Sequence, residues 1–259
     1  MAEVAIVADA DAAGELAASI MERLLRRRPD AVLGVATGST PLSSYRALAA
    51  KQLDLSGVTA FALDEYVGLA PGHPQSYLAV IDREVTGQLG LDPARVHVPG
   101  AELEVGADAA ALERAGERYE RAIADAGGID LQLLGIGATG HIGFNEPGSS
   151  LASRTRVKTL MRLTRIDNAR FFDSVDEVPR HCITQGLGTI LEARYLVLLA
   201  FGEHKADAVA GALEGPVSAS IPGSVVQLHP RVTVIVDEAA ASGLRFGDYY
   251  RDAWENAPR

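Results

Sequence analysis

The stretch LQLLGIGATGHIGFNEPGSS, residues 131–150, decides the fold of this chain. It begins with a short apolar run and then breaks at three glycines. Apolar runs of this length that end in glycines are typical of buried strands in a parallel sheet. Ligands of open α/β sheets bind just beyond the carboxyl ends of such strands. The titratable side chains that follow this run, His141 and Glu146, are therefore the first candidates for chemistry.

Similar apolar runs alternate with amphipathic segments along the rest of the chain. Besides the run at 131–135, we expect an edge strand at 4–7 and further strands at 31–36, 58–63, 95–98, 193–200 and 231–236. Strands that alternate with helices predict a doubly wound, mainly parallel open α/β sheet, Rossmann-like, with helices on both faces. No composition shift marks a linker, so we expect a single domain over residues 1–259, with 158–182 as a candidate mobile lid.

Composition excludes several classes of function. A net charge of -10 argues against non-specific binding to nucleic acids or anionic membranes, so an anionic ligand must meet a local basic site. The single cysteine, Cys182, suits a reducing compartment, and we expect it to be a buried, unreactive thiol. The N-terminal segment has no signal-peptide pattern and no apolar run long enough to span a membrane, so we expect a cytoplasmic protein.

The turn after the strand at 31–36 has the composition of an anion-binding loop. Thr37, Gly38, Ser39 and Thr40 expose backbone N–H groups at a strand-to-helix junction. Lys205 follows the strand at 193–200 in the same way, so the two could face one phosphate. As a plain helix cap and an exposed helix-start lysine, the same residues would need no ligand, and the sequence leaves both interpretations open.

Carboxylates also follow a predicted strand. The run at 58–63 ends in Asp64 and Glu65, and ionised groups that leave a sheet must be solvated or paired. No residues stand at metal-ligand spacing, and no dinucleotide-binding fingerprint is present. These residues predict proton transfer without a cofactor on a small phosphorylated molecule, with Asp64, His141 and Glu146 as acid and base candidates.

Four segments carry a resemblance to a known family: ATGSTPLSSY at 36–45, FALDEYVGL at 61–69, GHIGFNEPGSSLASRTRVKTL at 140–160 and VVQLHP at 225–230. Together they resemble the glucosamine-6-phosphate deaminase family. The resemblance implies an enzyme that converts glucosamine 6-phosphate and water into fructose 6-phosphate and ammonia. It also implies that no metal or organic cofactor takes part in the chemical step.

The resemblance assigns roles residue by residue. Asp64 matches the base that moves the C2 proton to C1, His141 matches the group that opens the sugar ring, and Glu146 lies in its relay. The phosphate-holding positions of the family fall on Gly38, Ser39, Thr40, Arg170 and Lys205. Thr139 departs from the pattern, because many members have Asp there. A hydroxyl can orient the imidazole but supplies no charge, so we expect Glu146 to carry more of the relay.

The resemblance also bears on how the protein is regulated and whether it forms oligomers. Some relatives are hexamers with an effector site, and Ser149, Ser150, Arg156 and Lys158 match positions used there. The resemblance therefore makes this chain a candidate for homo-oligomer formation and for effector binding.

Two other functions compete with the deaminase. A sugar-phosphate lactonase of similar fold is expected to have Arg at the position of Tyr66 and to lack the sequence FNEP of 144–147. A non-catalytic sugar-phosphate sensor would keep the phosphate loop without the chemistry, and only Thr139 favours it.

Overall fold

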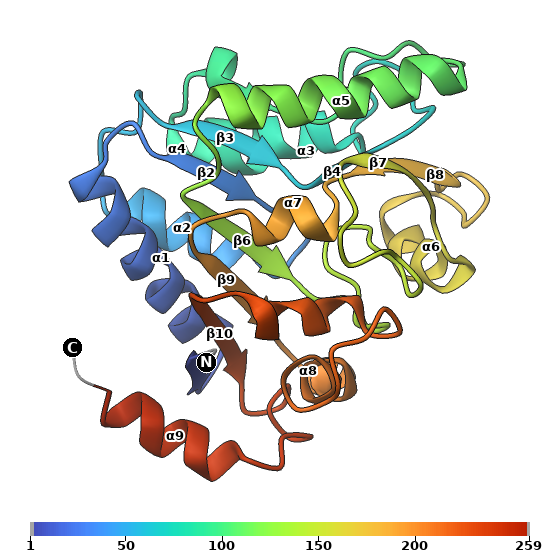
Figure 1. Cartoon of the computed structure of the whole chain (residues 1–259). Coiled ribbons are helices and arrows are strands. Elements are labelled where there is room, and N and C mark those ends of the chain that lie inside the picture. Colours follow the sequence, from blue (N-terminus) through green and yellow to red (C-terminus); the bar gives the residue numbers. More distant parts are fainter. Residues whose placement is uncertain (1–2, 258–259) are drawn as a thin grey trace.

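A central parallel sheet organises the computed structural model, which describes residues 3–257 (Figure 1). Its strand order is β1-β10-β9-β6-β2-β3-β5, and every neighbouring pair is parallel. The strands are β1 (Glu3–Val7), β2 (Val32–Val35), β3 (Thr59–Ala62), β5 (Val96–His97), β6 (Leu131–Gly135), β9 (Leu196–Ala200) and β10 (Val232–Asp237). The seven strands expected from sequence are confirmed, and β1 lies at an edge.

Helices connect these strands. They are α1 (Ala10–Arg27), α2 (Leu42–Ala50), α3 (Tyr77–Ile81), α4 (Gly87–Leu89), α5 (Ala109–Asp125), α6 (Arg162–Asn168), α7 (Leu187–Leu191), α8 (Ala206–Leu213) and α9 (Gly247–Glu255). Shorter helical segments are the π-helical η1 (Asp82–Thr86) and the 3-10 segments η2 (Pro93–Arg95), η3 (Ala169–Phe171), η4 (Glu203–Lys205) and η5 (Pro222–Leu228). Side-chain caps explain several starts, because Asp9, Ser76 and Asp108 each accept a backbone N–H of the first helical turn.

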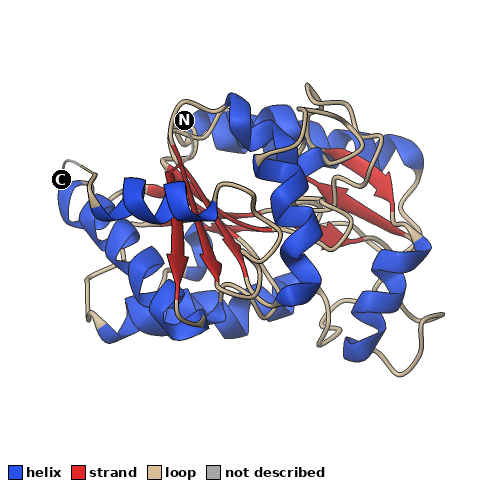
Figure 2. Ribbon diagram, turned by 90° about the horizontal axis from the view of Figure 1, so that it is seen from below, coloured by secondary structure: helices blue, strands red, loops and turns tan. Residues whose placement is uncertain are grey.

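The two faces of the sheet are covered by different helices, which confirms the doubly wound arrangement. Alternate side chains of one strand enter opposite cores: Leu196 and Leu198 of β9 pack with α5, α7 and α8, and Val197 and Leu199 pack with α1 and α2. Figure 2 shows helices on both sides of the strands. No helix in the described range 3–257 is long and apolar enough to cross a membrane.

A second sheet was not predicted. It has the order β4-β8-β7, is antiparallel, and consists of β4 (Asp64–Tyr66), β7 (Arg156–Thr159) and β8 (His181–Thr184). These strands are short and rich in polar residues, so they lack the apolar runs by which the main sheet is recognised. The small sheet matters for the site, because β4 follows β3 after one residue.

Candidate active site

A cavity of about 620 Å³ opens at the carboxyl ends of β2, β3, β6 and β9. Its lining includes most of the predicted site residues: Thr37, Gly38, Ser39, Thr40, Asp64, His141, Arg170 and Lys205. They come from the loops after β2 and β6, from the start of β4, and from η3 and η4, so the fold brings together residues more than a hundred positions apart. Thr139 and Glu146 do not line the cavity but contact the imidazole of His141.

The imidazole of His141 packs directly over the glycine loop that follows β6. A Cβ built on Gly137 would lie 2.2 Å from Nε2 of His141, so only glycine leaves room for the ring. Nδ1 lies 2.8 Å from Oγ1 of Thr139 and 3.3 Å from Oε2 of Glu146. The ring is therefore held on one side by the loop and on the Nδ1 side by a hydroxyl and a carboxylate.

Glu146 is buried, and its surroundings favour the ionised form. Its side chain is 3% exposed, and Oε1 accepts the backbone N–H of Met161 at 3.1 Å. Burial opposes ionisation, but the side chains of His141 and Thr164 and the Met161 amide outweigh it, so the pKa of Glu146 lies below its ordinary value. A carboxylate beside Nδ1 favours a proton on that nitrogen and leaves Nε2 to exchange protons.

Asp64 lies at the start of β4 and is 6% exposed. Burial raises the pKa of its carboxyl to about 8; the charge of Glu65 adds to the rise and the Phe144 amide opposes it. The loop with His141 passes beside Asp64, since a Cβ built on Gly143 would lie 3.4 Å from Oδ2 of Asp64. A carboxyl with a pKa near 8 is poised to exchange a proton near neutral pH.

Glu65 does not share the site of Asp64. Its Oε1 accepts the backbone N–H groups of Tyr66 and Tyr77, both at 2.7 Å, and its Oε2 accepts that of Leu78 at 2.8 Å. Glu65 thus anchors the start of α3 to β4. Asp64 thus faces the cavity, whereas Glu65 caps a helix. The sequence alone could not distinguish these two adjacent carboxylates.

The cavity lining also includes two cationic side chains, those of Arg170 and Lys205. Gly38 has φ +89°, a conformation that favours glycine and turns the 37–40 loop toward the cavity lining. Burial lowers the pKa of the Lys205 ammonium; Asp167 raises it and Arg170 lowers it. Among the described residues neither Arg170 nor Lys205 forms an ion pair; Arg170 lies 4.8 Å from the ring centroid of Phe171. Two unpaired cations beside exposed loop amides can bind a phosphate.

The four candidate effector residues lie outside the cavity lining. Ser149 is buried and its hydroxyl donates to the Glu146 carbonyl at 2.7 Å, whereas Ser150 is exposed. Arg156 donates to Oδ1 of Asn145 at 2.9 Å, and Lys158 lies two residues further along β7. The effector site stays a prediction.

Sequence reasoning missed several lining residues. His204, which no sequence pattern singles out, lines the cavity beside Lys205. Other unexpected lining residues are Gln75, Tyr77, Arg83, Glu84, Asp167 and Asn168. Only Asp167 and Asn168 carried a signal, since they lie close to Arg170 in the sequence. Cys182 has 0% exposure, which confirms the predicted burial, and burial raises the pKa of its thiol well above the ordinary value.

The chain is similar to known proteins in both sequence and fold. Residues 7–235 match a family described as glucosamine-6-phosphate isomerases/6-phosphogluconolactonase. The chain is 58% identical to the glucosamine-6-phosphate deaminase of Bifidobacterium longum, over 100% of this chain and 98% of the relative. It is 58% identical to that of Streptomyces coelicolor, over 99% and 98%. A solved structure of a monomeric glucosamine-6-phosphate deaminase superposes with a TM-score of 0.87 at 41% identity, covering 93% of this chain and 99% of that one.

Proposed function

Because the chain belongs to the glucosamine-6-phosphate isomerase/6-phosphogluconolactonase family, we propose that it converts glucosamine 6-phosphate and water into fructose 6-phosphate and ammonia. One observation supports this assignment above all: Asp64 and His141 line the same cavity as the two cations Arg170 and Lys205. Its full-length relatives at 56% to 58% identity are named deaminases.

The phosphate end orients the substrate in this proposal. Arg170 and Lys205 neutralise the phosphate, and the amides and hydroxyls of residues 37–40 hold its oxygens. Fixing one end of the hexose places its other end at Asp64 and His141, which lowers the entropic part of the barrier. The bound sugar would also occupy the space in front of Asn168, at the end of α6.

His141 opens the ring. A cyclic amino sugar has no acidic C–H, so a proton must first move between the anomeric hydroxyl and the ring oxygen. With Nδ1 held by Thr139 and Glu146, the other ring nitrogen, Nε2, carries that proton. The Thr139 hydroxyl orients the ring and the Glu146 carboxylate supplies the charge that Thr139 lacks.

Asp64 then moves the proton of C2. Its carboxylate takes the C2 proton of the open aldehyde, which gives an enolamine, and the proton returns to C1. The carbon that carries the amine becomes an imine, and water hydrolyses it to the ketone with release of ammonia. Each positioned acid or base of this kind is worth roughly 10²- to 10⁴-fold in rate.

Ammonia release from glucosamine 6-phosphate, measured beside hydrolysis of a sugar-phosphate lactone, tests the proposal. We expect ammonia and fructose 6-phosphate in equal amounts and no lactone hydrolysis. Lactone hydrolysis without ammonia would favour the lactonase, and sugar-phosphate binding without turnover would favour the sensor. Added N-acetylated sugar phosphate tests the predicted effector residues Ser149, Ser150, Arg156 and Lys158 in the same assay.

Compartment and assembly are proposals of the same kind. We propose that the protein works in the cytoplasm, since a single buried cysteine suits a reducing compartment. A homo-oligomer stays a prediction; a solved relative is described as monomeric, and light scattering of the purified protein would decide between the two.

A further inference from the structure

Asn145 is the central member of a buried polar network beside the active site. It has 0% exposure and lies in the turn between His141 and Glu146. Its Nδ2 donates to the carbonyls of Ile142 at 3.0 Å and Gln185 at 2.8 Å. Its Oδ1 accepts from Nη1 of Arg156 at 2.9 Å. Carbonyls only accept and a guanidinium only donates, so these three partners allow one orientation of the amide.

The same network reaches the strand that precedes Asp64. The Gln185 amide side chain donates to the Ala62 carbonyl at 3.1 Å, and its backbone N–H donates to the Leu63 carbonyl at 2.8 Å. Asn145 therefore ties the His141 turn to Ala62 at the end of β3 and to Leu63, the residue before Asp64. A shift of Asn145 would change the position of the imidazole relative to Asp64.

Arg156 is the only charged member of this network of Asn145 and its partners. It is the first residue of β7, it is partly buried, and among residues 3–257 no carboxylate pairs with it. Besides Asn145 it donates only to the Arg154 carbonyl, at 3.3 Å. Burying a charged guanidinium costs free energy that one hydrogen bond to a neutral amide only partly offsets. The contact with Asn145 therefore adds little stability and is better explained by the orientation it gives that amide.

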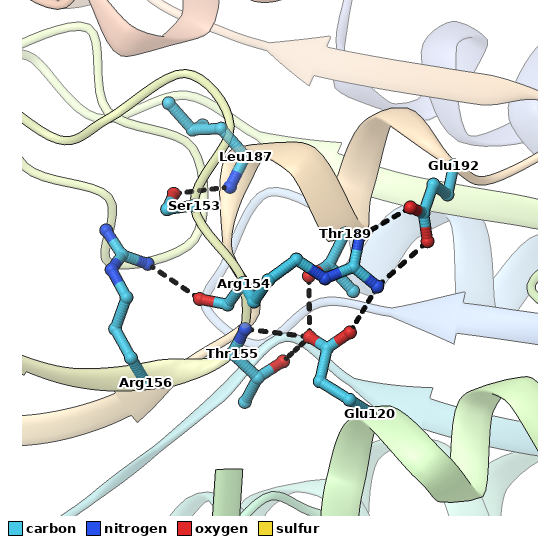
Figure 3. Close-up of polar contacts among 8 residues, drawn as sticks. All are labelled: Glu120, Ser153, Arg154, Thr155, Arg156, Leu187, Thr189 and Glu192. Carbon is cyan, nitrogen blue, oxygen red and sulfur yellow. Dashed lines mark hydrogen bonds and ion pairs between the residues drawn. The ribbon is translucent and has the colours of Figure 1, made fainter. Parts of the chain in front are cut away.

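The backbone that carries Arg156 is itself firmly anchored (Figure 3). The backbone N–H and hydroxyl of Thr155 both donate to Oε1 of Glu120, as does the hydroxyl of Thr189. Arg154 pairs with Glu120 and Glu192 on the same side. Helix α5 also approaches closely, because a Cβ on Gly116 would lie 2.7 Å from the Thr155 carbonyl. The guanidinium of Arg156 thus extends from a fixed point.

We propose that Arg156 is a positioning residue of the deamination reaction, which through Asn145 holds His141 and Glu146 in register with Asp64. The inference rests on the proposed function. It also assigns Arg156 a task in the enzyme without any effector, in contrast to the effector role implied by family resemblance. Arg156 touches no cavity-lining phosphate residue, so its loss should affect the chemical step and leave substrate binding intact.

Three variants test this proposal: Arg156→Met, Arg156→Lys and Arg114→Met. Arg114 is exposed, lies on α5 outside the 158–182 segment, and its guanidinium forms no hydrogen bond or ion pair within the described residues. We expect Arg156→Met to lower kcat about 10- to 100-fold with KM near the wild-type value, because small misplacements of catalytic groups have effects of this size. Arg156→Lys keeps a charged donor and should recover part of kcat, and Arg114→Met should match the wild type.

Thermal unfolding of each variant accompanies the kinetics, and Arg156→Lys remains informative if Arg156→Met does not fold. The proposal is wrong if both Arg156 variants keep the wild-type kcat. It is also wrong if Arg156→Lys recovers nothing and kcat, KM and Tm all worsen together, as a general structural role would predict. A wild type that releases no ammonia would overturn the proposed function, and the inference with it. An active wild type with an unchanged Arg156→Met would overturn the inference alone.

Discussion

The absence of a side chain at Gly137 leaves room for the imidazole of His141, the proposed ring-opening group. The His141 imidazole occupies the space in which a Cβ of residue 137 would lie, 2.2 Å from Nε2. We expect Gly137→Ala to displace the ring and to lower kcat about 10- to 100-fold. Steady-state kinetics would measure this, with Gly247→Ala as control, because a Cβ at Gly247 meets nothing within 4 Å. An active Gly137→Ala enzyme would show that the ring is not fixed by this contact.

Asp64 links activity to pH. Since burial raises its pKa to about 8, kcat/KM should rise with pH up to about 8 and level off above it. Asp64→Asn should lower kcat at least about 10²- to 10⁴-fold while sugar-phosphate binding persists. A profile of kcat/KM that is flat between pH 6 and 9, as an order-of-magnitude window around that pKa, would contradict the role of Asp64.

The same carboxyl should reduce stability. A carboxyl whose pKa is raised in the folded protein costs stability as the pH rises from its ordinary value of 3.8 to about 8. Asp64→Asn removes this cost, so the variant should resist urea better than the wild type at pH 9. The difference should shrink toward pH 4, and equal stability at both pH values would refute the buried charge.

Lys205 should act mainly on binding. A charge-assisted hydrogen bond to a phosphate is worth about 1.5 to 3 kcal/mol, so Lys205→Ala should raise KM roughly 10- to 100-fold with a smaller effect on kcat. Substrate saturation curves measure both constants. An unchanged KM would mean that the phosphate lies elsewhere in the cavity.

The site residues that could be predicted share a simple position in the sequence. Asp64, Thr37 and Lys205 each follow an apolar strand, and parallel strands end at the same edge of a sheet. Glu65 has the same position as Asp64 but caps α3, because its partners lie on a helix that the strand pattern does not locate. His204 was missed because a lone histidine at a helix start has no pattern that indicates a cavity.

At the scale of elements, the parallel sheet was predictable and the small sheet was not. Strands β2, β6 and β9 are apolar runs that are buried on both faces, which is the clearest strand signal. Strand β7 reads RVKT, and its role depends on pairing with β8 far along the chain. Such long-range pairing leaves no local pattern, so the basic segment after Glu146 gave no sign of its strands.

Glu120 of α5 accepts hydrogen bonds from Thr155, just before β7, and from Thr189 of α7. The stability of this junction should therefore depend on pH in the acid range. Burial opposes its ionisation, but hydrogen bonds from Thr155 and Thr189 and the charge of Arg154 outweigh it, so the pKa of Glu120 lies below its ordinary value of 4.5. The stability that the Glu120 carboxylate contributes is fully present above its ordinary pKa of 4.5. It is lost as the pH falls through the lowered pKa of the folded protein.

We therefore expect Glu120→Gln to lower the free energy of unfolding by about 1 to 3 kcal/mol at pH 7, with a smaller loss below pH 4.5. Urea unfolding measures both, with Glu117→Gln as control. Glu117 is on the same helix, but its side chain is 59% exposed and only pairs loosely with Arg121. Equal losses in the two variants would show that the junction is not stabilised by Glu120.

At the scale of the whole molecule, the predicted lid at 158–182 can be tested. Asp167, Asn168 and Arg170 lie within it and line the cavity, so a bound sugar phosphate should restrain it. We expect fructose 6-phosphate to slow backbone amide exchange in 158–182 and to leave α9 unchanged. Protection of residues 37–40 without any change in 158–182 would show that this segment does not close over the ligand.

The proposed base, Asp64, lies at the junction between the parallel sheet and the antiparallel sheet. Leu63 alone separates the end of β3 from Asp64, the first residue of β4. The large sheet contributes most of the buried core, whereas Asp64 is held in the small sheet by its pairing with Thr184 of β8. We therefore expect substitutions in β8, which pairs directly with β4, to shift Asp64 more than substitutions in β1, at the far edge of the large sheet.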